Sequence, residues 1–234
     1  MHRVLGFDTS TAHLTVAVTA SSEVVSEQEV EPDETGRPRH ARRLLEVVES
    51  ALEETGGWDG VGLIAVGAGP GTFTGLRIGI STARALAQAR GLPVTAVSSL
   101  RALAEGARGG TEAPILAILD AKRQESFAAL YGPAGEERWA PCVGGPAELG
   151  RRIAALPDPP LAVGDGAVRF RAEFEASGAR VPPDADPRHR LYARHVCRLA
   201  EDTEAEPLAD IKPTYLRRPD AELWRERDRG STKS

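Results

Sequence analysis

Hydrophobic and polar positions change their period along the first hundred residues of the chain. Three segments with apolar side chains at strand spacing come first, and helical and extended patterns then alternate. The pattern predicts strands at residues 3–8, 13–19, 23–30, 61–66 and 94–97, and helices at 40–55, 75–90 and 98–105. Three consecutive strands followed by alternating helices and strands indicate a mixed sheet flanked by helices.

A second round of this pattern starts after residue 108. The stretch 107–114 contains glycines and a proline and breaks both periods, so we expect a domain boundary there. Beyond it, the pattern predicts strands at 115–120, 126–131 and 161–163, and helices at 146–155, 168–177 and 191–201. The repeat indicates an α/β fold with two ribonuclease-H-like lobes in tandem. This is the architecture of the sugar kinase, actin and heat-shock ATPase superfamily, abbreviated ASKHA.

These patterns divide the chain into three units. Residues 1–108 form the predicted N-terminal lobe, and residues 109–218 form the predicted C-terminal lobe. Residues 219–234 are mostly charged or small, and we expect them to form a flexible tail.

Composition narrows the class of protein. The 234 residues are 41% hydrophobic and 27% charged, with a net charge of −5. No apolar run approaches the roughly 20 residues that cross a bilayer, and the first residues lack a signal-peptide pattern, so we expect a cytoplasmic location. Cys142 and Cys197 stand far apart in the sequence, which argues against a disulfide framework or a zinc module. The acidic balance argues against binding nucleic acid over a broad face, so any contact with RNA is expected through a partner.

A glycine-rich turn joins the strand at 61–66 to the helix at 75–90. Its glycines and proline are Gly69, Pro70, Gly71 and Gly75. Such a turn can cradle a phosphate with its backbone N–H groups. However, a P-loop needs a lysine after the last glycine, where this chain has Leu76, and the dinucleotide and hydrolase patterns also fail. A phosphate cradle and a structural turn both stay open, and the spacing favours the structural turn.

Two aspartates are candidates for chemistry. Asp8 and Asp120 each end a predicted strand and begin a polar turn. In a two-lobed ATPase, acids at these places lie near the metal and the phosphates, whereas the alternative is a turn acid that bonds its own backbone. The residue pattern favours the turn acid. The five histidines form no H-x-x-x-H or H-E-x-x-H pair, so we predict no metal site and no cofactor.

The two long helices of the first lobe carry more apolar surface than one sheet face needs. The apolar residues of 40–55 cover an arc of about 160° at 100° per residue. The helix at 75–90 is apolar or small apart from one polar stripe, formed by Arg77, Ser81, Arg84 and Gln88. The helices are therefore either internal to the lobe or present a seam to another subunit, and the pattern alone favours neither.

Several motifs resemble those of the TsaB (YeaZ) family. The strongest is GPGTFTGLRIG at residues 69–79, and LGFDTST (5–11), HARRLL (40–45), PVTAVSSL (93–100), AILDAKR (117–123) and PTYLR (213–217) extend the resemblance over residues 3–217. The resemblance implies an ASKHA fold in which the C-terminal segment can return to the first lobe. It also implies a role in making threonylcarbamoyladenosine beside the anticodon of tRNAs that read codons beginning with A.

Members of this family are regarded as non-catalytic partners of the transferase TsaD, a paralogue, with the ATPase TsaE joining the pair. In TsaD, a histidine pair after a strand holds the metal. Ser99 and Leu103 take those positions in this chain, and neither is a suitable ligand. The resemblance thus implies a scaffold subunit that forms a heterodimer with TsaD and a ternary complex with TsaE. It would meet tRNA only through that complex, with a homodimer possible for the isolated chain.

The resemblance also implies an interface on the two long helices of the first lobe. The predicted partner-binding residues are His40, Arg43, Leu44, Val47, Val48, Ala51, Arg77, Ile80, Ala83, Arg84 and Ala87. On this hypothesis Val47→Glu and Ala83→Glu abolish TsaD binding while leaving the fold intact. Unfolding of these variants would instead mean that both positions belong to the core.

Two other classes of function stay open. One is an active small ATPase or sugar-kinase-like enzyme that uses Asp8, Asp120 and the Gly164-Asp165-Gly166 turn, and an ATP hydrolysis assay would identify it. The other is a metallopeptidase, which the missing metal ligands disfavour.

Overall fold

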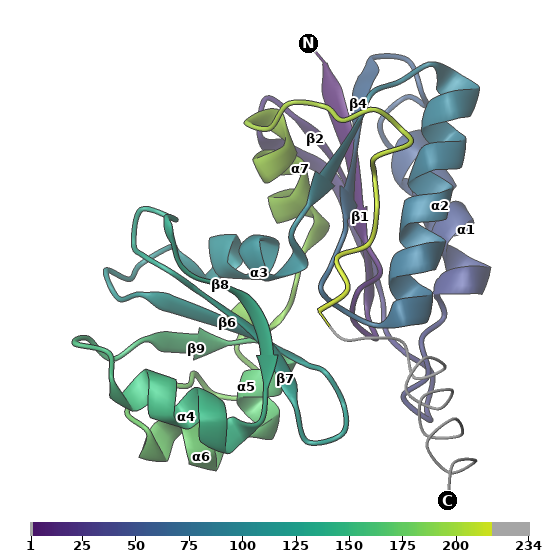
Figure 1. Cartoon of the computed structure of the whole chain (residues 1–234). Helices are drawn as coiled ribbons and strands as arrows, with labels where there is room; N and C mark the ends of the chain where they lie inside the picture. Colours follow the sequence, from purple (N-terminus) through teal and green to yellow (C-terminus); the bar gives the residue numbers. More distant parts are fainter. Residues whose placement is uncertain (1, 217–234) are drawn as a thin grey trace, which may run out of the picture.

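The computed structural model describes residues 2–216 and consists of two lobes, each built on its own mixed sheet (Figure 1). The first sheet has the order β3-β2-β1-β4-β5. Strands β1, β2 and β3 form an antiparallel meander, while β4 and β5 run parallel to β1. The bounds are β1 Arg3–Asp8, β2 Leu14–Ala20, β3 Glu23–Val30, β4 Val61–Gly67 and β5 Val94–Val97.

Helices cover both faces of the first sheet (Figure 1). Helices α1 (His40–Glu53) and α2 (Phe73–Arg90) lie side by side on one face, where their apolar arcs pack on alternate residues of β1 and β2. Helix α7 (Ala193–Glu201) covers the opposite face and packs against β1 and β2. No helix among residues 2–216 is long and apolar enough to cross a membrane.

The second lobe repeats this plan with a smaller sheet of order β8-β7-β6-β9. Helix α3 covers one face of it, and α4, α5 and α6 lie on the other (Figure 1). The bounds are α3 Ser99–Ala107, β6 Ile115–Asp120, β7 Ser126–Tyr131, β8 Glu137–Gly144, α4 Pro146–Ala154, β9 Leu161–Val163, α5 Asp165–Arg169, α6 Arg171–Ala176 and the 3-10 turn η1 Pro187–His189.

The sequence pattern missed one strand and merged two helices. Strand β8 is an edge strand that is mostly exposed or half-buried and contains Pro141, so it lacks the alternation that reveals a strand. The helix predicted at 168–177 is two helices, because the backbone leaves helical geometry at Phe170. The first of them begins at Asp165, within the predicted turn.

The two lobes exchange helices across the predicted boundary at residue 108. Helix α3, predicted in the N-terminal lobe, packs into the core of the second sheet. Helix α7, predicted in the C-terminal lobe, packs on the first sheet. The following segment, yellow in Figure 1, also lies on the first lobe, where Ile211 is buried and the Thr214 N–H donates to the Ala68 carbonyl at 2.8 Å. The predicted boundary therefore separates the two sheets, but it does not separate the helices that pack on them. The predicted tail at 219–234 lies outside the described residues.

The contact between α7 and α3 should make stability depend on pH. The His195 ring lies against Gly106, and burial lowers its pKa from 6.5 to about 4. Because the folded state favours the neutral ring, its contribution to stability is present above pH 6.5 and is lost as pH falls toward 4. We expect His195→Gln to flatten this part of the profile in urea unfolding. His2→Gln, at an exposed position, is the control, and its unfolding free energy should depend on pH as that of the wild type does.

Candidate functional site

The glycine-rich turn is pressed against the loop that joins β1 to β2. A Cβ on Gly75 would lie 1.9 Å from the Thr9 carbonyl oxygen. The Thr9 hydroxyl donates to the Gly75 carbonyl at 2.8 Å, and the Thr72 N–H donates to the Ser10 carbonyl at 2.7 Å. These contacts direct the N–H of Thr72 into the protein rather than toward a phosphate. They support a structural turn that sets where α2 begins.

A Gly75→Ala variant should lose much of its stability. The added methyl group meets backbone, which cannot move aside as a flexible side chain can. Overpacking of this kind costs about 3 kcal/mol, or a fall of about 6–12 °C in the melting temperature of a chain this size. Thermal unfolding by circular dichroism measures it, and Gly109→Ala, where a Cβ meets open space, is the control. Equal melting temperatures for the two variants would contradict the packing role.

Asp8 is committed to a buried hydrogen-bond network. Its side chain is 1% exposed. One carboxylate oxygen accepts from the N–H and the hydroxyl of Ser10, both at 2.6 Å, and the other accepts from the Ser99 hydroxyl at 2.7 Å. Ser99 in turn accepts from the Gly69 N–H at 3.2 Å. Asp8 therefore ties the β1–β2 loop to α3 and the glycine-rich turn, and Ser99 belongs to the same network.

Asp120 is held by cations of the second lobe. Lys122 Nζ contacts one oxygen at 2.8 Å, and Arg169 contacts the other at 2.6 Å. Burial pushes the pKa of Asp120 upward, but the hydrogen bonds from Lys122 and Arg169 outweigh it and hold the pKa below its usual value. The Asp120 N–H donates to Asp165 at 2.9 Å, and burial raises the pKa of Asp165. The acids of the rival ATPase hypothesis thus have partners within the protein.

A cavity of about 250 Å³ lies between the lobes, next to these acids. Its lining residues are Thr11, His13, Glu29, Leu119, Asp165, Val168, Asp184, His189, Arg190 and Leu191. Three carboxylates against one arginine make it a poor site for a polyphosphate. The sequence analysis did not predict this cavity, because its lining comes from segments far apart in the chain.

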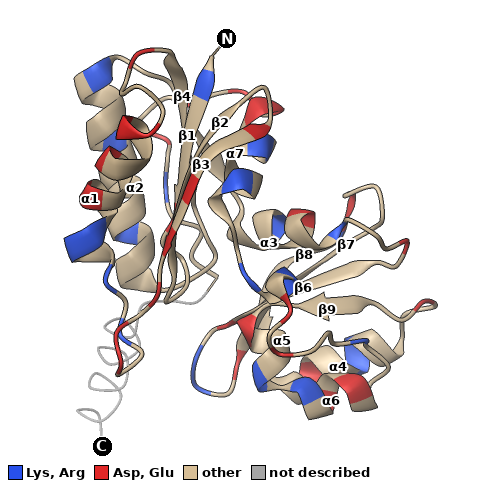
Figure 2. Cartoon of the chain, turned by 180° about the vertical axis from the view of Figure 1, so that it is seen from behind, with Lys and Arg blue, Asp and Glu red and all other residues tan. Residues whose placement is uncertain are grey.

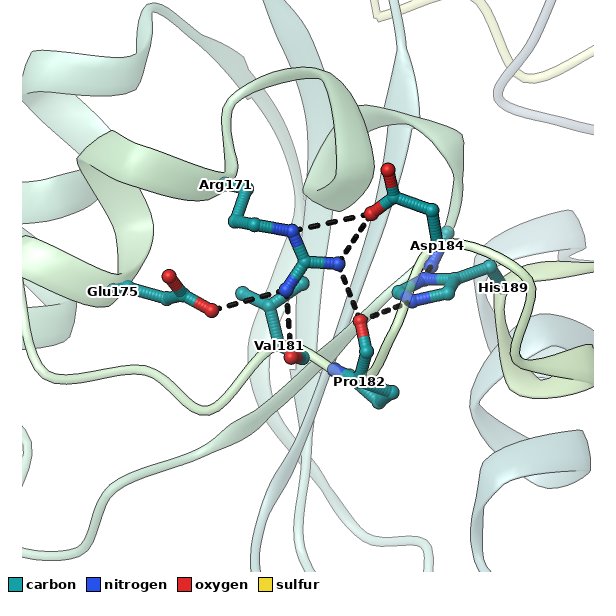
Figure 3. Close-up of polar contacts among 7 residues, drawn as sticks. Arg171, Glu175, Val181, Pro182, Asp184 and His189 are labelled. Carbon is teal, nitrogen blue, oxygen red and sulfur yellow. Dashed lines mark hydrogen bonds and ion pairs between the residues drawn. The ribbon is translucent and has the colours of Figure 1, made fainter.

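One wall of the cavity is fixed by hydrogen bonds (Figure 3). His189 Nδ1 accepts from the Gly164 N–H, and Nε2 donates to the Pro182 carbonyl, both at 3.1 Å. Arg171 contacts Asp184 at 2.6 Å and also donates to the Val181 and Pro182 carbonyls. Both ring nitrogens of His189 are thereby used, so this histidine supports the wall and is not poised to bind a metal.

The described part of the chain offers no cluster of three or more His, Cys, Asp or Glu that could hold a metal. Leu103, at one of the two positions that the resemblance matches to metal-binding histidines, is buried in the core of the second lobe. Ser99, at the other, is fully buried and hydrogen-bonded to Asp8. These residues do not fit a metal centre.

Most of the predicted partner-binding residues are buried within the chain, which corrects that prediction. Each of these eight side chains is at most 4% exposed: His40, Leu44, Val47, Val48, Ala51, Ile80, Ala83 and Ala87. The helical period finds an apolar arc correctly, but it does not say whether a sheet or a partner covers it. Here the first sheet and the neighbouring helix cover it, so Val47 and Ala83 do not face a partner.

The three predicted arginines have different surroundings. Arg43 is half-buried and pairs with Glu46 at 2.8 Å. The Arg77 guanidinium lies 3.9 Å from the ring centre of Phe73 and donates to the Tyr215 hydroxyl at 3.2 Å, so it holds the C-terminal segment on the start of α2. Arg84 is exposed.

The outer faces of α1 and α2 carry exposed apolar and small residues that the sequence analysis did not single out. Leu45 is 61% exposed, the highest value among the large hydrophobic residues of the described chain. Ala41 lies one turn before it on α1, and Ala85 and Ala89 are exposed one turn apart on α2. Ala41 and Leu45 lie within the apolar arc predicted for residues 40–55, and Ala85 and Ala89 are among the apolar or small residues of 75–90, but the pattern does not separate these exposed members from the buried ones. We call these four residues the outer face.

Comparisons with known proteins agree on one family. The family model for TsaD, described as tRNA N6-adenosine threonylcarbamoyltransferase, matches residues 19–222. TsaB of Escherichia coli, described as a tRNA threonylcarbamoyladenosine biosynthesis protein, is 37% identical over 55% of this chain and 54% of its own length, so the match spans about half of that relative. An uncharacterized protein of Mycobacterium tuberculosis is 34% identical over 93% of both chains.

Solved structures support the same assignment. YeaZ from Pseudomonas aeruginosa has a TM-score of 0.74 and 30% identity, over 92% of this chain and 100% of that one. EutJ from Carboxydothermus hydrogenoformans, at 13% identity and a TM-score of 0.50 over 84% of this chain and 90% of that one, shares the fold alone. The predicted ASKHA fold is confirmed. The chain therefore belongs to the TsaB (YeaZ) family, within the wider family of the TsaD threonylcarbamoyltransferases.

Proposed function

We propose that this chain is a non-catalytic subunit in tRNA threonylcarbamoyladenosine biosynthesis and that it docks on a TsaD-type transferase through the outer face of α1 and α2. Family membership supports the place in this pathway. The ATPase TsaE joins the pair, and the modified base is the adenosine beside the anticodon. The complex works in the cytoplasm.

The observation that carries the docking proposal is the exposure of Leu45, one turn after Ala41 on α1, together with the exposed Ala85 and Ala89 on the neighbouring helix α2. An exposed leucine next to alanines lets a second pair of helices approach closely and bury apolar area. One side of α1 and α2 already packs on the first sheet. A partner docked on their other side would cover the outer face, so that the helices would lie between this lobe and the partner. In the absence of TsaD, a second copy of the chain can cover the same face and form a homodimer.

The non-catalytic assignment rests on how the candidate acids and metal positions are used. Asp8 accepts three hydrogen bonds inside the protein, and Asp120 is held between Lys122 and Arg169. Ser99 and Leu103 supply no metal ligand pair. The TsaD partner would then supply the transfer chemistry, and this chain would hold it in its active arrangement.

Mixing the purified chain with TsaD from the same organism tests the docking proposal. Size-exclusion chromatography with light scattering should give a complex of one copy of each, with TsaE joining it in the presence of ATP. Two separate peaks at micromolar concentrations would overturn the proposal. Steady ATP hydrolysis by the chain alone would favour the rival ATPase.

A further inference from the structure

An arginine-lined groove lies at the start of α1. It has a volume of about 610 Å³ and is lined by Asp33, Arg37, Pro38, Arg39, Ala41, Arg42 and Arg43. Figure 2 shows basic positions at the beginning of α1 and in the loop before it, near the acidic end of β3. Four of these seven lining residues are arginines, in a chain with a net charge of −5.

Three of these arginines are free to bind an anion. Arg37, Arg39 and Arg42 are exposed, and none of them forms an ion pair with another described residue. Arg43 pairs with Glu46 at 2.8 Å. By contrast, Arg169, Arg171, Arg188, Arg190, Arg194 and Arg198 of the second half each contact a carboxylate.

The carboxylates nearby do not neutralise the groove. Asp33 accepts hydrogen bonds from the N–H and hydroxyl of Thr35 and from the Arg37 N–H, which shape the loop. Arg39 adds its charge to the effects that lower the pKa of Asp33. Glu31 pairs with Arg190 at 2.9 Å and with His13 at 3.0 Å, not with an arginine of the groove. The seven lining residues therefore keep a surplus of positive charge.

The groove fits phosphates better than a protein surface. Its apolar lining is limited to Pro38 and Ala41, whereas protein partners usually insert an aromatic or large aliphatic anchor. Guanidinium groups bind phosphate oxygens with paired hydrogen bonds, and phosphate contacts require no apolar pocket. Ala41 also belongs to the outer face, so a phosphate chain in the groove would run beside the docked partner.

We propose that Arg37, Arg39 and Arg42 form a contact site for the phosphate backbone of RNA, which holds the tRNA substrate against the complex. The proposal rests on the proposed function, because the transferase complex is what brings RNA to this chain. It gives the chain a local part in substrate binding despite its acidic overall charge.

The test is a triple variant, Arg37→Gln, Arg39→Gln and Arg42→Gln. The matched control is Arg101→Gln, Arg151→Gln and Arg180→Gln, which changes the net charge equally at exposed arginines of the second lobe and of helix α3, which packs on it. Each is combined with TsaD, and binding of a labelled tRNA transcript is followed by fluorescence anisotropy at several salt concentrations. The groove variant should bind about tenfold more weakly, with a salt dependence smaller by about two to three phosphate contacts. The control should stay within about twofold of the wild type.

The outcomes separate this proposal from the proposed function. A groove variant that still forms the TsaD complex but binds tRNA like the control overturns the RNA contact and leaves the proposed function intact. A variant that loses TsaD but keeps RNA affinity shows a protein contact instead, which also overturns it. If the wild-type chain forms no TsaD complex, the proposed function fails. The same comparison on the chain alone, where the groove variant should still be the weaker binder, then decides the RNA contact.

Discussion

Ala83→Glu should unfold the chain rather than merely weaken a partner contact. Ala83 is fully buried in α2, facing the core of the first lobe. A glutamate there would insert volume and an unpaired charge, which costs several kcal/mol and is comparable to the stability of a whole domain. Circular dichroism should show a lost or strongly lowered thermal transition.

Ala85→Glu is the matched control, because the same change is made two residues further along α2 at an exposed position. We expect its thermal unfolding to stay close to that of the wild type. A folded Ala83→Glu variant that loses TsaD binding would contradict the structure and restore the partner-facing assignment of that position.

Leu45→Glu and Ala85→Glu should abolish the TsaD complex while leaving the fold intact. Both place a charge on the outer face, where docking would desolvate it without a partner. Losing a central contact of this kind costs about 2–5 kcal/mol, which lowers affinity by roughly a hundredfold or more. Isothermal titration of each variant with TsaD measures the effect.

Val25→Glu controls for a charge placed on any exposed apolar residue. Val25 is 50% exposed on the edge strand β3 and is not one of the four residues of the outer face. It should bind TsaD as the wild type does. Equal losses for Val25→Glu and Leu45→Glu would mean that general aggregation, not the outer face, explains the result.

The sequence pattern predicted the layers of this fold closely because most strands are buried. The bounds of the buried strands β1, β5, β6, β7 and β9 match the predicted ranges. Strand β8 was missed because it is mostly exposed or half-buried and contains Pro141, which is typical of a turn rather than a strand. The exchange of α3 and α7 between lobes could not be predicted, because periodicity shows which face of a helix is apolar but not which sheet covers it.

The same limit explains the candidate site. Val47, Ala83 and Leu45 all carry the apolar signal of the two helices, but Val47 and Ala83 pack inside the lobe whereas Leu45 is exposed, a difference that the period does not show. The network of Asp8 with Ser10 and Ser99 joins residues 91 positions apart, which no local pattern reveals. The structural role of the glycine-rich turn was easier to predict, because the close packing of strand and helix requires glycines that are near one another in the sequence.

Threonylcarbamoyl transfer to tRNA distinguishes a non-catalytic subunit that activates TsaD from an enzyme that acts alone. Threonylcarbamoyl transfer to tRNA is measured with this chain alone, with TsaD and TsaE but no chain, and with TsaD and TsaE titrated with the chain. Our expectation is no transfer by the chain alone and a saturable stimulation of TsaD that is lost with Leu45→Glu. Robust transfer by the chain alone, or full TsaD activity that the chain does not change, would contradict it.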